Sequence, residues 1–264
     1  MVQLTSSVES PVRLITIPVS HYCEKTRWAL TRLKIPFVEE PHMPPFHRFA
    51  TQKVGGQSVP VLVTATSVLT NSEEILEYAD AIAPDEAKLY PADPENRRQV
   101  EKLVRAFDSV LAPAVRQWFY FHTFDQPQLI QPLWCQGVPW FERVFFPLAF
   151  KLLGPKLLQA YSINAESAIT AHKSICKILE RVDSLLADGR THLVGNQFSA
   201  ADLTFATLGA PVVLPAGYSV KPPELSELPS QMVADIQVFR ETLAGKFILR
   251  LYQEHEQTIR SLSV

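Results

Sequence analysis

The sequence predicts a two-domain protein, with an α+β domain of βαβ-ββα order over residues 1–83 and an all-α helical bundle over residues 95–264. Three observations support this prediction. Strand-like and helix-like patterns alternate in the first part of the chain. Residues 84–94 contain three prolines and several charged residues, a composition typical of an interdomain linker. Beyond the linker, apolar residues recur at helical spacing, and no strand pattern interrupts them.

The first domain is predicted to begin with a strand, a helix and a second strand. Residues 12–17 are β-rich and alternate weakly, whereas residues 22–33 carry apolar side chains at helical spacing. Residues 36–39 resemble a short second strand. The prolines within residues 41–45 break regular structure, so we expect a loop before residues 46–52.

A hairpin and a capped helix are predicted to complete the first domain. Residues 59–63 and 66–69 are two β-rich runs joined by a short polar link. Asn71 then opens a helix that runs to about residue 83. Its first turn contains acidic side chains, which the helix dipole favours at this end.

The second domain is predicted to be helical throughout. Apolar residues recur at spacings of three and four over residues 100–111 and again over residues 169–185. Further along, Ser199 and Asp202 have the spacing of a capping box, with Phe198 placed as its apolar staple. We assign this motif a structural role, with Asp202 buried, and no chemistry.

Composition restricts the class of protein. The 264 residues are 47% apolar, which is enough for a large core. The formal net charge is −2, and no run of like charges is present, so nucleic acid is not an expected partner. Three cysteines at irregular spacing argue against a secreted disulfide framework. Since we find neither a secretory pattern nor a membrane-spanning apolar window, we expect a cytoplasmic protein without a membrane span.

The segment with the most chemical potential is Ser20-His-Tyr-Cys23, where the first strand gives way to the first helix. Backbone amides and the helix dipole stabilise an anion at such a position, and a thiolate is one such anion. The spacing matches a dithiol turn whose leading cysteine has become serine. A serine hydroxyl can hydrogen-bond a substrate thiolate and keep it ionised. On these residues alone, the simpler interpretation is that Ser20 is an N-cap and Cys23 a small core residue.

Two further features favour a ligand site. Pro60 follows Val59 at the entry to a strand, where a proline is often cis and turns the preceding backbone N–H and C=O outward to pair with an extended peptide. Ser72, at the start of the next helix, offers a hydroxyl and free amides to a carboxylate. Together with the serine turn, these features indicate one ligand, a peptide thiol.

This arrangement resembles the glutathione S-transferase superfamily, and the resemblance covers nearly the whole chain. It implies a thioredoxin-like N-terminal domain that binds glutathione, followed by an all-helical domain that binds a second substrate. Family members with a serine or cysteine nucleophile place it at the strand-to-helix turn. Aligned on Lys25-Thr-Arg27, that residue is Ser20, and Cys23 takes the resolving position.

The same resemblance implies four glutathione contacts in addition to Ser20. Val59 matches the residue whose backbone pairs with the cysteinyl part of glutathione, and Pro60 matches the cis-proline. Asn71 and Ser72 match the pair that holds the γ-glutamyl end. Asn71 is one methylene shorter than the glutamate or glutamine usual at its position.

Histidines give no support to a metal site. They lack the H-x-x-H and H-E-x-x-H spacings, so we expect no metal. His21 lies inside the serine turn and could tune the charge of the sulfur, although a solvated loop histidine is the simpler interpretation. His47 and Lys53 precede Val59 and could meet the glycyl carboxylate of glutathione.

An aromatic region, residues 118–150, has two interpretations. Its rings could line a pocket for an apolar electrophile beside the sulfur, and for that role we select Trp118 and Phe121. They could instead form a helical core or a subunit interface. A membrane-surface interpretation of residues 138–158 is weaker, because three prolines interrupt them and the polar face is sparse.

The resemblance implies a cytoplasmic, homodimeric glutathione transferase of the detoxification type, with glutathione as co-substrate and no metal. Ser20 and the helix start would stabilise the thiolate for attack on an electrophilic carbon of an apolar small molecule. Two alternatives stay open. One is glutathione-dependent thiol reduction or peroxide removal through Cys23 and a mixed disulfide. The other is a non-catalytic binding protein that has kept the fold.

Overall fold

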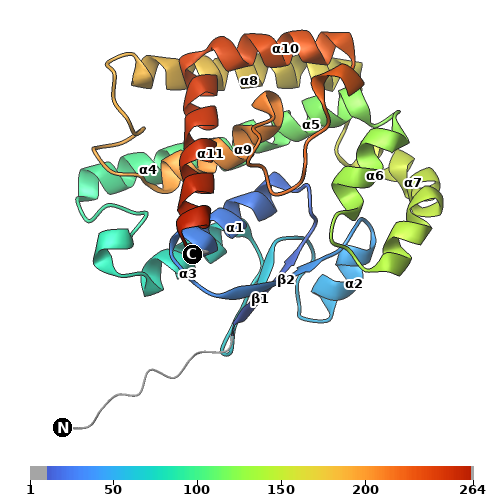
Figure 1. The fold of residues 1–264 in the computed structure, drawn as a ribbon, viewed down its shortest axis with the longest axis horizontal. Coiled ribbons are helices and arrows are strands. Elements are labelled where there is room, and N and C mark those ends of the chain that lie inside the picture. Colours follow the sequence, from blue (N-terminus) through green and yellow to red (C-terminus); the bar gives the residue numbers. More distant parts are fainter. Residues whose placement is uncertain (1–10, 263–264) are drawn as a thin grey trace.

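Strand β1 (Val12–Thr16) has a neighbour on each side in a four-stranded sheet of order β2-β1-β3-β4 (Figure 1). The computed structural model describes residues 11–262. β2 (Phe37–Pro41) runs parallel to β1, with Val12 opposite Phe37. Such a parallel pair needs a crossover, and the first helix supplies it.

The other half of the sheet is antiparallel. β3 (Val61–Val63) pairs with β1, with Leu62 opposite Leu14, and β4 (Val68–Leu69) pairs with β3 as a hairpin. The helices of this domain are α1 (His21–Arg32), α2 (Phe46–Gln52) and α3 (Ser72–Ile82). The predicted βαβ-ββα order is confirmed, with the short helix α2 added after the prolines. Helix α2 spans only seven residues and has no side-chain cap. The sequence therefore contains neither a long periodic pattern nor a capping motif that would predict it.

After β4 and α3 the described chain is helical. A 3₁₀ turn, η1 (Asp85–Ala87), precedes the first long helix, and the division into domains at residues 84–94 stays a prediction. The elements that follow are α4 (Pro94–Ala106), the π-helical turn η2 (Phe107–Leu111), α5 (Ala112–Thr123), α6 (Pro127–Cys135), α7 (Trp140–Ala160), α8 (Ala165–Leu186), α9 (Ala200–Val213), the 3₁₀ turn η3 (Leu225–Glu227), α10 (Ser230–Glu241) and α11 (Leu243–Leu262).

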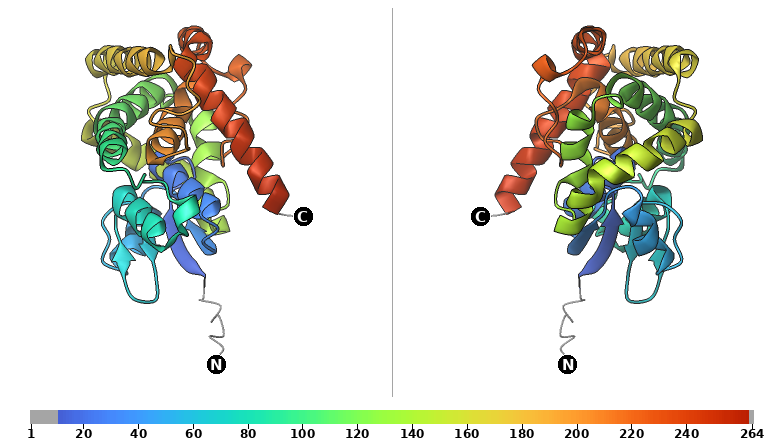
Figure 2. Two further views of the ribbon diagram at one scale, coloured as in Figure 1. Left: turned by 90° about the vertical axis from the view of Figure 1, so that its left-hand side faces the viewer. Right: turned by 90° about the vertical axis from the view of Figure 1, so that its right-hand side faces the viewer.

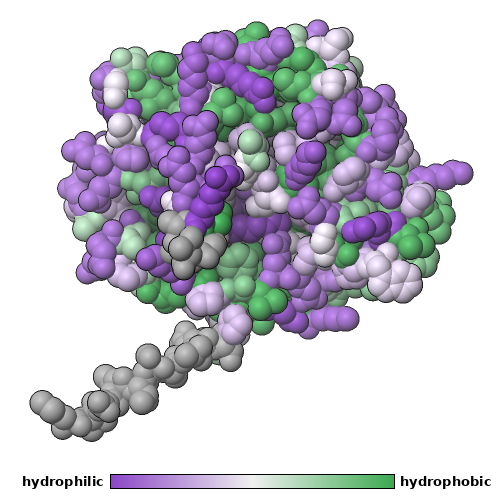
Figure 3. Space-filling model, in the orientation of Figure 1, coloured by the Kyte–Doolittle hydropathy of each residue, from purple (hydrophilic) through white to green (hydrophobic). Residues whose placement is uncertain are grey.

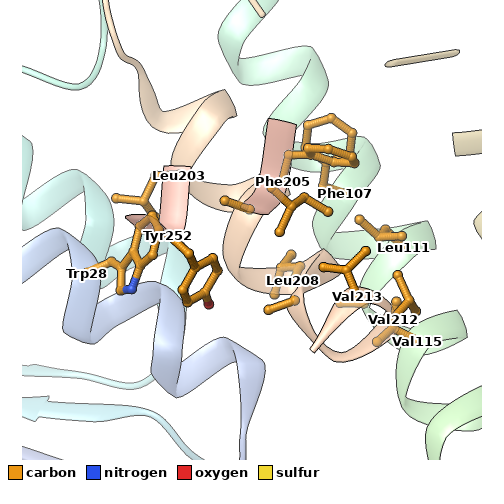
Figure 4. Close-up of a cluster of buried hydrophobic side chains, with 14 of the residues drawn as sticks. Trp28, Phe107, Leu111, Val115, Leu203, Phe205, Leu208, Val212, Val213 and Tyr252 are labelled. Carbon is orange, nitrogen blue, oxygen red and sulfur yellow. The ribbon is translucent and has the colours of Figure 1, made fainter. Parts of the chain in front are cut away.

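Helix α9 lies at the centre of the core. Every one of its residues except Pro211 is buried, which is the signature of a helix that is packed on all sides. Figure 4 shows its side chains between two groups of partners. Trp28 of α1 and Tyr252 of α11 lie on one side, and Phe107, Leu111 and Val115 lie on the other. The core is therefore continuous from α1 in the sheet domain into the helical domain.

Helix α1 also brings charged side chains into this interface. The Lys25 ammonium is fully buried and lies 2.7 Å from Asp108 of η2. Arg27 pairs with Glu24 at 3.1 Å and with Glu39 at 2.7 Å. These buried charges are all paired, as burial of an ion requires. They fix α1 against its own sheet through Glu39 and against the following helices through Asp108. Figure 2 shows the ribbon of the sheet domain below the helices that follow it.

The aromatic region divides between core and surface. Trp134 and Phe146 are buried, in agreement with the helical-core interpretation. In contrast, Trp140 is 78% exposed and Val144 is 68% exposed on the outer face of α7. Green residues lie among purple ones at the right-hand edge of Figure 3, where Figure 1 places α7. Within residues 11–262, no helix combines the length and the apolarity that crossing a membrane requires.

Candidate active site

A cavity of about 660 Å³ opens between the sheet domain and the helices that follow it. The sheet domain supplies the turn that opens α1, the segment that enters β3, and the start of α3. The helical domain supplies walls from α5, α6, α7 and the segment after α9. The cavity thus brings together segments that are far apart in the sequence.

Ser20 lies on this cavity at the first turn of α1. It is the N-cap residue, and its Oγ accepts a hydrogen bond from the Cys23 N–H at 3.4 Å. The first N–H groups of a helix have no partner inside the helix, and the dipole makes this end positive. The predicted capping role of Ser20 and a position facing a ligand are therefore compatible, because a capping hydroxyl keeps its proton to donate elsewhere.

Cys23 does not line the cavity, which corrects its selection as a catalytic candidate. The residue has no exposed surface at all. Burial raises the pKa of its thiol to about 11, against the smaller lowering effects of Arg27 and Ser20. As the third residue of α1, Cys23 faces the core rather than the ligand side. The simpler interpretation, a small core residue, is the one that the structure shows.

Val59 and Pro60 both line the cavity, and the peptide bond between them is cis. Among residues 11–262, none forms a hydrogen bond with the backbone of Val59. Its N–H and C=O are consequently available for an extended peptide placed beside them, in the manner of an added strand.

Asn71 and Ser72 complete the sheet-domain side of the cavity. Asn71 is the N-cap of α3, and its Oδ1 accepts a hydrogen bond from the Glu74 N–H at 2.9 Å. The shorter side chain is thus used for capping. The side-chain NH₂ of Asn71 and the N-terminal backbone amides of α3 remain available to a ligand carboxylate. Two helix N-termini, those of α1 and α3, face the same cavity.

The other polar side chains on the cavity are basic or neutral. His21 and His47 line it, and burial lowers the pKa of His21 to about 3 and that of His47 to about 4, so both are neutral at pH 7. Lys53 lies instead on a second, smaller cavity beside His42. His47 lies on the main cavity, where its predicted contact with the glycyl carboxylate of glutathione is possible. Lys53 does not line the main cavity.

The structure places neither Trp118 nor Phe121 on the cavity, which corrects the predicted second-substrate pocket. The Trp118 ring is buried, and its Nε1–H donates to Asp235 at 3.2 Å. Phe121 is 41% exposed and is not on the cavity wall. Both lie on α5 as predicted, but at the wrong rotation about its axis. Each helical residue turns by about 100°, so an error of one or two positions selects another face.

The face of α5 that does line the cavity carries Val115, Arg116, Phe119 and Tyr120. Their i, i+3, i+4 spacing was visible in the sequence and is the signal that could have identified them. Arg116 is the one charged residue of this face. Its guanidinium carbon lies 4.0 Å from the centroid of the Tyr161 ring.

Two phenols that the sequence did not single out hold the serine turn in place. Tyr22 donates to the carbonyl of Asp108 at 2.9 Å, and Tyr218 donates to the carbonyl of Val19 at 2.9 Å. Both partners are remote in sequence, so no local pattern could have revealed them. Within the described residues, no group of three or more histidine, cysteine, aspartate or glutamate side chains is arranged to hold a metal ion.

Residues 14–87 match the family model for the glutathione S-transferase N-terminal domain. Residues 14–87 therefore carry a glutathione S-transferase N-terminal domain. This matched segment contains Ser20, Val59, Pro60, Asn71 and Ser72. The recognised resemblance is thereby confirmed. No curated protein sequence matched the chain.

Several solved structures share the fold over nearly the whole chain. A glutathione S-transferase of Ceriporiopsis subvermispora in complex with glutathione is 18% identical, covers 94% of this chain and 98% of its own, and gives a TM-score of 0.60. The beta-etherase LigF from Sphingobium sp. strain SYK-6 is 16% identical, with 91% and 99% covered and a TM-score of 0.59. FzlA from C. crescentus is 19% identical, with 91% and 92% covered and a TM-score of 0.55.

Proposed function

We propose that this protein binds glutathione in the cavity between the sheet and the helices and joins the glutathione sulfur to an electrophilic carbon of a second substrate. One observation carries the proposal. Ser20, the backbone of Val59, and the Asn71–Ser72 pair come from three separate segments, yet they line one cavity whose opposite wall is largely apolar. Each offers the group that one part of a cysteine-containing tripeptide needs.

The sheet-domain side suits the tripeptide in an extended conformation. Its cysteinyl backbone would pair with Val59, and its γ-glutamyl carboxylate would meet the N-terminal amides of α3 beside Ser72. The thiol would then lie at the mouth of α1, next to Ser20. We infer a glycyl carboxylate near His47, whose neighbour Arg48 also lines the cavity.

Ser20 acts in this proposal as a hydrogen-bond donor to sulfur. The thiol loses its proton to solvent, and the hydroxyl together with the α1 dipole stabilises the resulting thiolate. The thiolate then attacks the electrophilic carbon, a C–S bond forms, and the leaving group departs with its bonding electrons. Positioning and charge stabilisation are the protein's contributions.

The reductase alternative would need Cys23 to attack a disulfide, a peroxide or another substrate. Its thiol is buried in the core and has a raised pKa, and thiolate character with access is what reactivity requires. No observation favours this alternative. The homodimer, the cytoplasmic location and the apolar nature of the second substrate stay predictions.

The test compares Ser20→Ala with Cys23→Ala, each checked for native circular dichroism. Calorimetry measures glutathione binding, ultraviolet difference spectra follow the pKa of the bound thiol, and an aryl halide reports conjugation. We expect Ser20→Ala to raise the pKa of the bound thiol and to reduce kcat/KM by on the order of 10²-fold, as loss of one charge-stabilising donor does. Cys23→Ala should leave conjugation unchanged.

The opposite pattern would support the reductase alternative, since Cys23→Ala would then abolish glutathione-dependent disulfide or peroxide turnover. If the wild-type protein releases no heat with millimolar glutathione and conjugates nothing, the protein is not a glutathione-dependent enzyme. A binding protein that has kept the fold would then be the remaining interpretation.

A further inference from the structure

The geometry points to an anion subsite at Arg116, so that the second substrate is an apolar or aromatic electrophile that carries a carboxylate or a similar acidic group. The inference rests on the proposed function for the reaction that this substrate undergoes. The subsite itself is a statement about binding, and it can be tested without glutathione.

The charges on the cavity wall are all of one sign. Among residues 11–262, the charged residues that line it are Arg48, Arg116 and Lys156, and no aspartate or glutamate does. Arg48 lies on α2 and Lys156 on α7, and both are exposed to solvent. Arg116 is partly buried on α5, among the apolar residues Val115 and Phe119. It is therefore the cation that a ligand inside the apolar part of the cavity would meet.

The guanidinium of Arg116 has no anionic partner in the described part of the chain. No ion pair or hydrogen bond within residues 11–262 involves this side chain, and its Nε is buried without a hydrogen-bond partner. Stacking on the Tyr161 ring holds the planar group while it leaves the N–H edges unused. A guanidinium held in this way presents two parallel donors to a carboxylate. Buried donors of folded proteins are normally paired, so the unpaired Nε calls for an explanation.

The position of Arg116 separates this subsite from the glutathione contacts. Ser20, Val59 and the Asn71–Ser72 pair all belong to the sheet domain, whereas Arg116 belongs to the helical wall. Arg116 nevertheless lines the same cavity as the serine turn, and its charge helps to lower the pKa of His21 in that turn. An acidic group bound at Arg116 would therefore place the electrophilic carbon of a small ring near the sulfur.

The experiment uses two probes with the same reactive ring, 4-chloro-3,5-dinitrobenzoate and its methyl ester. Calorimetry without glutathione measures the binding of each probe, and steady-state kinetics with glutathione then gives KM and kcat. The variants are Arg116→Gln, which removes the charge, and Arg116→Lys, which keeps it. Lys156→Gln is the matched control, because it removes one positive charge from the same cavity. Circular dichroism and thermal melts establish that each variant is folded.

We expect the wild-type protein to bind the benzoate more tightly than the ester. Arg116→Gln should weaken benzoate binding by roughly 10- to 100-fold and raise its KM more than it lowers kcat, as loss of a hydrogen-bonded charge pair predicts. Arg116→Lys should recover part of the affinity. Ester binding and Lys156→Gln should stay within a small factor of the wild type. Each variant is compared with the wild type on the same probe, which cancels the intrinsic reactivity of the two rings.

Three results would overturn the subsite: equal wild-type affinity for both probes, an equal loss for both probes in Arg116→Gln, or an equal loss of benzoate binding in Lys156→Gln. An equal loss in Lys156→Gln would show that the benzoate responds to the overall positive charge of the cavity and not to a specific site at Arg116. Benzoate binding that depends on Arg116 without any conjugation would keep the subsite and refute the proposed function. Conjugation of both probes that does not change in the Arg116 variants would keep the proposed function and refute the subsite.

Discussion

Replacement of Lys25 by methionine tests how the helical domain holds the first helix in place. The Lys25 Nζ lies 2.7 and 3.0 Å from the two carboxylate oxygens of Asp108. The lysine side chain has no exposed surface, and the aspartate side chain is 19% exposed. Methionine keeps most of the apolar stem of lysine and removes only the charged end.

The expected loss follows from what the variant leaves behind. Removing one partner of a buried ion pair costs roughly 3–5 kcal/mol, because the other charge stays desolvated. Asp108 keeps some contact with water, so we expect the lower end, about 3 kcal/mol of the free energy of unfolding. The double variant Lys25→Met/Asp108→Leu replaces the pair by two apolar groups. It should lie within about 1 kcal/mol of the wild type.

Urea unfolding followed by tryptophan fluorescence and circular dichroism gives the free energies for this double-mutant cycle. We expect a coupling energy of at least about 2 kcal/mol. Arg98→Met is the control, because it breaks a 2.5 Å ion pair with Glu95 in which both side chains are exposed, and it should change nothing measurable. The reasoning is refuted if Lys25→Met changes stability by no more than this exposed control does.

Two further predictions concern Asp202 and His42. Asp202→Ala leaves the N–H groups of Leu193 and Ser199, now bonded at 2.8 and 2.7 Å, buried without an acceptor, so urea unfolding should show a loss of about 3 kcal/mol. His42 has a pKa raised by its hydrogen bond to Glu142, so its contribution to stability is complete below its unfolded value and disappears as the pH rises through its folded value. His21 and His47, whose pKa values burial lowers, act in the opposite direction, so the measurement is the difference between the urea midpoints of the wild type and His42→Gln. The wild type should exceed the variant most at about pH 5, and this difference should shrink as the pH rises to about 9.

Features with a local signal in the sequence were predicted well. The N-caps Ser20 and Asn71 and the capping box at Ser199 and Asp202 all occur as expected. Each involves a side chain and a backbone group only a few residues apart, so the pattern contains both partners. The order of strands followed from the same kind of signal, because β-rich runs and turn residues mark the ends of each strand.

Features that depend on rotation or distant partners were not predicted. Whether α5 shows Trp118 or Arg116 to the cavity depends on its rotation about its own axis, and apolar residues on both faces made that rotation ambiguous. The contact of Tyr218 with the serine turn spans 199 residues. Such contacts are set by packing of the whole core, which no local pattern encodes. The rotation of α7, which leaves Trp140 and Val144 exposed, likewise depends on this packing and was not predicted.

The arrangement also explains why Ser20→Ala should weaken and not abolish the stabilisation of a thiolate. Ser20 is one of several positive or proton-donating features on the glutathione side of the cavity, which also include the N-termini of α1 and α3. His21 and His47 add no charge at pH 7, because burial keeps both neutral. Since no acidic side chain of the described residues lines the cavity, an anion bound there stays stabilised after the serine is lost. The part that disappears is the directed hydrogen bond at sulfur, and this is why thiol pKa and kcat should change more than glutathione affinity.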